Sequence, residues 1–86
     1  MNVCVVTTFE CTFDEFKAMF EKSMAEGGAA FMTEYELVKV NEHKSIFMGN
    51  VTDFEAMGAM MASPESKKWD EENGCVDTVY MMQKME

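Results

Sequence analysis

Three acidic side chains in predicted strands are the groups best suited to acid/base chemistry. Glu34 and Glu36 are two positions apart, so they share one strand face about 7 Å apart along the chain. Such a carboxylate pair can have separated pKa values and exchange a proton with a substrate, although same-face carboxylates also mark a wet sheet edge. Asp77 has Cys75 and Val79 on its own face. It is the candidate catalytic residue, because a buried carboxylate is expensive and usually has a purpose.

Histidine and cysteine are too few, and too scattered, to predict a metal centre. His43 is the one histidine and lies in the polar segment Asn41-Glu42-His43-Lys44, where a solvated loop residue is the simpler interpretation. Cys4, Cys11 and Cys75 show no CxxC spacing, and no set of residues has the spacing of a zinc site. We therefore expect neither a metal nor a cofactor.

The odd number of cysteines favours reduced thiols in a cytoplasmic protein. Cys4 and Cys75 are expected to act as small apolar residues in strands. Cys11 is also expected to be an inert thiol. The alternative is a reactive thiol, because Cys11 comes just before a predicted helix, whose dipole would lower the pKa of the thiol.

Methionine is abundant, with 11 residues in a chain of 86. Because methionine adapts to varied apolar shapes, these side chains can fill an irregular core or line a cleft for a small hydrophobic molecule. On the second interpretation the ligand-binding residues are predicted to be Tyr35, Met57, Met61, Trp69 and Tyr80.

The residue pattern predicts four strands and two helical segments that would position these groups. Strands are expected at 3–9, 30–40 and 46–51, and a fourth is expected to begin at 75 and end at 82 or 84. A helix is expected to begin at Thr12 and run to Glu26, with an apolar stripe of Phe13, Phe16, Phe20 and Met24. The sequence T-F-D-E that opens it is a capping box.

The second helical segment repeats this pattern and is broken. T-D-F-E predicts a capping box with Thr52 as the N-cap, and Ser63-Pro64 restarts the helix, which ends at Asn73-Gly74. Two βαβ halves in one α+β domain, residues 1–86, predict a ferredoxin-like βαββαβ fold. Its four-stranded antiparallel sheet would carry its helices on one face.

Charge excludes several partners. Seven lysines face 16 acidic residues, arginine is absent and the net charge is −9. Phosphate backbones and anionic lipids would be repelled, so we expect no nucleic acid and no membrane partner. The apolar start of the chain lacks a basic region and predicts a strand instead of a signal peptide, and no stretch is long enough to span a membrane.

The predicted first and third strands carry apolar residues on both faces, while helices can cover only one. A homodimer that pairs sheet against sheet would bury the other face. The element order, together with the break at Met60-Met61-Ala62-Ser63-Pro64-Glu65 before Lys68-Trp69, resembles the dimeric α+β barrel superfamily of antibiotic-biosynthesis-monooxygenase-like proteins. The resemblance implies a dimeric barrel with a cleft between sheet and helices, where catalytic members carry Asn, Trp and His.

Two functions follow. The first, which we prefer because catalytic groups are few, is a binding or structural module whose cleft holds a small apolar molecule or nothing. The second is a cofactor-independent enzyme, monooxygenase-like or isomerase-like, that uses Asp77, Tyr35 or Trp69 in the same cleft. The burial of Asp77 in an enclosed pocket would separate the two.

Overall fold

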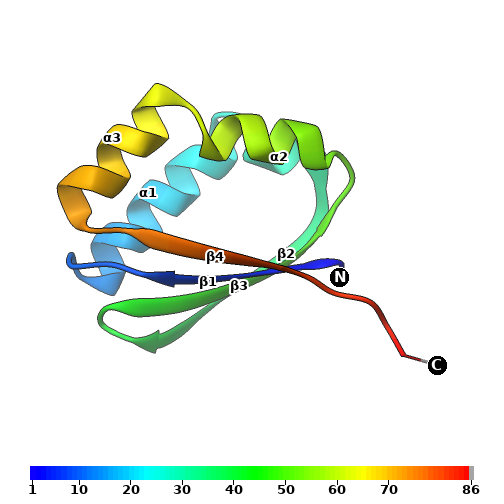
Figure 1. Cartoon of the computed structure of the whole chain (residues 1–86), viewed down its shortest axis with the longest axis horizontal. Coiled ribbons are helices and arrows are strands. Elements are labelled where there is room, and N and C mark those ends of the chain that lie inside the picture. Colours follow the sequence, from blue (N-terminus) through cyan, green and yellow to red (C-terminus); the bar gives the residue numbers. More distant parts are fainter. Residues whose placement is uncertain (86) are drawn as a thin grey trace.

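The computed structural model describes residues 1–85 and contains four strands, three α-helices and one 3₁₀ helix (Figure 1). In chain order these are β1 (Val3–Thr8), α1 (Phe13–Ala25), η1 (Gly28–Phe31), β2 (Met32–Asn41), β3 (Lys44–Val51), α2 (Phe54–Met61), α3 (Pro64–Asn73) and β4 (Val76–Met81). The strands form one antiparallel sheet in the order β2-β3-β1-β4. The three α-helices lie on one side of it (Figure 1). The predicted ferredoxin-like α+β fold is confirmed.

The start of the first helix and the restart of the second follow the sequence pattern. The Glu15 amide donates to the Thr12 hydroxyl over 3.2 Å, and the Thr12 amide donates to the Glu15 carboxylate over 3.3 Å, so the capping box is formed. Ser63 caps α3, with Pro64 in its first turn. These caps satisfy amides that a helix cannot pair internally.

The predicted cap of α2 is wrong by one residue. Asp53, and not Thr52, is the N-cap, because its carboxylate accepts from the Ala56 amide over 3.0 Å. The Thr52 amide is already used, since it donates to the Phe31 carbonyl over 2.8 Å. That bond ties the start of α2 to η1.

The second strand also begins later than predicted. Residues 28–31 form η1, and the extended backbone starts at Met32. Gly27 has a φ of 145°, a conformation that favours glycine, and its carbonyl accepts from the Ala30 amide. The short turn places Phe31, only 7% exposed, in the core.

The helix face of the sheet holds the core. Along β1 and β3 fully buried and partly buried residues alternate, as expected for strands with one covered face. Val3, Val5, Phe47 and Val51 form one cluster with Met57 of α2. A second cluster lies under α1, where the rings of Phe9 and Phe16 stack with centroids 4.5 Å apart.

The face away from the helices is apolar at its centre. The register places Val6 between Ile46 and Thr78, and Cys4 between Met48 and Tyr80. We call Cys4, Val6, Val38, Ile46, Met48 and Tyr80 the open face; its two outer members Val38 and Tyr80 are 43% and 54% exposed. Apolar residues therefore occupy both faces of β1 and β3, as predicted.

Candidate functional site: a methionine-lined cleft

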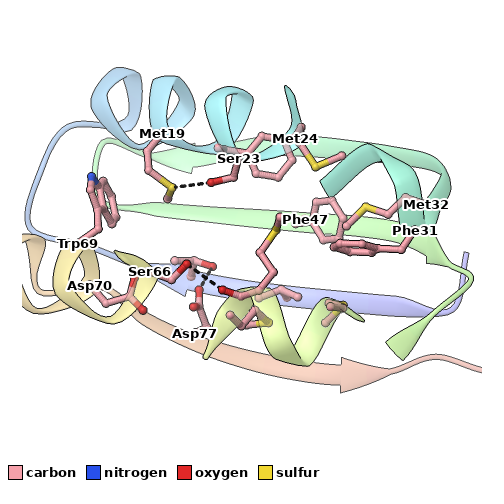
Figure 2. Close-up of a pocket in the computed structure, with 16 residues that line it drawn as sticks. Met19, Ser23, Met24, Phe31, Met32, Phe47, Ser66, Trp69, Asp70 and Asp77 are labelled. Atoms are coloured by element: carbon pink, nitrogen blue, oxygen red, sulfur yellow. Dashed lines mark hydrogen bonds between the residues drawn. The ribbon is translucent and has the colours of Figure 1, made fainter. Parts of the chain in front are cut away.

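A cleft of about 150 Å³ lies between the helix face of the sheet and the helices (Figure 2). Val5, Thr7 and Phe47 contribute from the sheet, and Phe20 and Trp69 from α1 and α3. Six of the chain's methionines line it: Met19, Met24, Met32, Met57, Met60 and Met61. Flexible thioether side chains can repack around an apolar guest with little strain, which suits such a wall to ligands of varied shape.

The five predicted ligand-binding residues separate into three groups. Met57, Met61 and Trp69 line the cleft. Tyr35 lies outside it, with its ring against Phe20 at 5.7 Å. Tyr80 lies on the open face and is also outside the cleft.

Several residues that line the cleft were not predicted to do so from the sequence, among them Met19, Met24, Met32, Met60, Ser66 and Asp70. Helical spacing could have indicated three residues of α1, because Met19, Ser23 and Met24 all face the cleft from that helix. No pattern in the sequence indicated Met32, because its place in the cleft depends on the turn at η1, which directly precedes it. Ser66 donates a hydrogen bond to the Met60 carbonyl over 2.9 Å and so links α3 to the end of α2.

The cleft has a polar end. Figure 2 shows Ser66, Asp70 and Asp77 gathered near Trp69, with Phe31 and Met32 toward the opposite end. Thr7 is 2% exposed, and its hydroxyl donates to a carboxylate oxygen of Asp77 over 2.6 Å. The expectation that Asp77 is buried is wrong: β4 is an outer strand and its residues are exposed, although Asp77 still lines the cleft.

Asp70, Cys75 and Asp77 bring one ligand atom each to within 4.8 Å of one another. Burial raises the pKa of the Cys75 thiol strongly, and the charges of Asp77 and Asp70 raise it further. Burial also raises the pKa of Asp70, against the opposing effect of its hydrogen bond from the Cys75 thiol. This group could contact a cation, but it offers fewer ligand atoms than the four of a closed zinc site, and its thiol is protonated at neutral pH.

The other candidate groups lie elsewhere. Glu34 and Glu36 are exposed on the outer strand β2, on the side of the open face. His43 is exposed in the β2–β3 hairpin, where its Nδ1 lies 3.0 Å from the Cys11 carbonyl oxygen. The pKa of Cys11 is raised, first by burial and then by the charge of Glu15, which favours the inert thiol over the reactive alternative.

The predicted resemblance to the dimeric α+β barrel superfamily is confirmed at the level of fold alone. Within residues 1–85, no helix is long and apolar enough to cross a membrane.

The solved structures that are similar to the chain include the following two. SnoaB, a cofactor-independent oxygenase from Streptomyces nogalater, aligns with a TM-score of 0.62 at 14% identity, covering 98% of this chain and 95% of SnoaB. A candidate antibiotic biosynthesis monooxygenase from Deinococcus radiodurans aligns with a TM-score of 0.51 at 10% identity, covering 96% and 94%. No protein-family model matches the chain, and no curated protein matches it in sequence.

Proposed function

We propose that this protein is a small binding module that holds a hydrophobic molecule in the methionine-lined cleft. The observation that carries the proposal is the cleft itself, with six thioether side chains and Trp69 around about 150 Å³. An apolar cavity of this size takes a guest of about one aromatic ring.

The polar groups support binding better than catalysis. Asp77 is exposed and holds a hydrogen bond from Thr7. The Cys75 thiol is protonated at neutral pH, because its pKa is raised by burial and by the neighbouring carboxylates. Neither group has the environment of an activated base or nucleophile.

A cofactor-independent enzyme is the second candidate. The likeness to SnoaB, a cofactor-independent oxygenase, and the presence of Asp77 and Trp69 at one cleft favour it. Consumption of oxygen or isomerisation of a bound aromatic molecule, lost in the Asp77→Asn variant, would support catalysis over binding alone.

The working form in this proposal is a cytoplasmic homodimer of single-domain subunits. The open face presents contiguous apolar side chains at the centre of the sheet, and a second copy of the same face would bury them by twofold symmetry. The three free thiols fit a reducing compartment. The Val6→Lys variant should be a monomer in sedimentation or light-scattering measurements. It would bury an unpaired lysine charge at the centre of the dimer interface, which is energetically costly.

The fluorescence of Trp69, the single tryptophan, tests the cleft. Titration of the full chain with 2-phenylethanol should change the emission saturably and raise the Tm. The Met61→Lys variant should abolish both effects, since it places a charge among the methionines. Met85, which is 95% exposed, provides the matched control Met85→Lys. No saturable response in the wild-type protein, or equal responses in both variants, would contradict the proposal.

A further inference from the structure

One row of residues across the helix face of the sheet is polar. The register pairs Ser45 with Thr7 and Thr7 with Asp77. The next row along the strands contains Phe47 and Val5 and is apolar. Thr7 and Asp77 of this row line the cleft, and Asp77 lies at the end of the cleft where Trp69 lies (Figure 2).

Buried hydroxyl groups in this row are incompletely used. Ser45 is 1% exposed, and among the described residues its hydroxyl has no hydrogen-bond partner. The hydroxyl of the neighbouring Thr7 donates its hydrogen bond to Asp77. Buried polar groups are normally paired. Ser45 is not among the residues that line the cleft, so the members of this row that a guest can contact are Thr7 and Asp77.

Acceptors outnumber donors at this end of the cleft. Asp70 and Asp77 converge with Cys75, and none of the residues that line the cleft is a lysine or histidine. Lys39 belongs to the same polar row, but it forms an ion pair of 2.6 Å with Glu42 on the surface. Within residues 1–85, the carboxylates thus face no lysine or histidine among the residues that line the cleft.

We infer that the ligand is a small organic amine with a ring-sized apolar body. This inference rests on the proposed function and names the class of molecule that the cleft takes. The body packs against the methionines, and the ammonium group donates to Asp70 and Asp77 beside the ring of Trp69, where a cation is further stabilised by the aromatic face. Carboxylate ligands are excluded by repulsion, and the net charge of −9 steers cations toward the protein.

Three probes of similar shape test the inference: 2-phenylethylamine, 2-phenylethanol and 3-phenylpropanoate, each titrated into the full chain with Trp69 emission as the readout. Hydrogen bonds in which both partners are charged are stronger than those of a neutral hydroxyl group. The amine should therefore bind about 10- to 100-fold tighter than the alcohol. Binding of 3-phenylpropanoate should not be measurable.

Charge-neutralising variants identify the groups responsible. In the Asp77→Asn variant the affinity for the amine should fall close to the affinity that the same variant has for the alcohol, and Asp70→Asn should act in the same direction. The control Glu34→Gln removes one charge from an exposed position outside the cleft and should retain the preference.

The possible failures can be told apart. Equal affinity for amine and alcohol, or a preference that survives Asp77→Asn, overturns the amine inference and leaves the binding module standing. No binding of any probe overturns both the inference and the proposed function.

Discussion

The bond between Thr7 and Asp77 anchors the polar end of the cleft, and Thr7→Val removes it with little change of shape. Thr7 is 2% exposed and donates over 2.6 Å to Asp77. A hydrogen bond to a charged acceptor contributes about 1.5–3 kcal/mol. The added valine methyl group, once buried, offsets about 0.8 kcal/mol of that loss.

The net effect of Thr7→Val is therefore a loss of about 1–2 kcal/mol in the free energy of unfolding. For a domain of this size, 1 kcal/mol lowers the Tm by about 4–8 °C. Thermal and urea unfolding followed by circular dichroism, at a fixed protein concentration, measure the change. Thr8→Val, at an exposed position of the same strand, is the matched control and should change stability little.

A double-mutant cycle decides whether the bond itself is responsible. Asp77→Ala leaves the Thr7 hydroxyl buried without its acceptor, so adding Thr7→Val should then be neutral or stabilising. If Thr7→Val lowers stability equally in both backgrounds, or not at all in the wild-type protein, the reasoning about this bond is refuted.

Three further predictions concern the surroundings of the cleft. Phe16→Ala should destabilise the fold by about 3–5 kcal/mol and shift Trp69 emission, because the two rings lie 6.0 Å apart; unchanged stability in urea would contradict this packing. Gly74→Ala should lower the Tm, since Gly74 has a φ of 57° and a Cβ there would lie 2.6 Å from Glu10 Cδ; an unchanged Tm counts against it. Because the folded-state pKa of Cys75 is raised, iodoacetamide at pH 8 should alkylate it far more slowly in the folded protein than in urea, as followed by peptide mass spectrometry; equal rates would argue against a protonated thiol.

Local signals predicted most of the fold. Runs of β-branched and aromatic residues predicted the strands. The Thr12 capping box and Ser63-Pro64 located two helix starts. The turn at η1 was missed because Gly28-Ala-Ala-Phe has no pattern that separates it from the strand that follows. The cap of α2 was missed because Thr52 and Asp53 are both good N-caps, and only a tertiary contact of the Thr52 amide with Phe31 decides between them.

The site was harder to predict because it depends on strand register. Asp77 and Tyr80 are three positions apart in one strand, which puts them on opposite faces, so they could not both belong to the helix-side cleft. The row of Ser45, Thr7 and Asp77 exists only when three strands pair in one particular register. Each residue taken alone is an ordinary polar residue of a strand.

The methyl groups of the methionines provide the most direct test of the binding site. With the methyl carbons of all 11 methionines isotope-labelled, NMR spectra recorded during titration with 2-phenylethanol report on each side chain. We predict shifts concentrated at the six that line the cleft, namely Met19, Met24, Met32, Met57, Met60 and Met61. The other five, Met1, Met48, Met81, Met82 and Met85, should stay in place. Shifts confined to those five, or no shifts, would contradict the assignment of the cleft as the binding site.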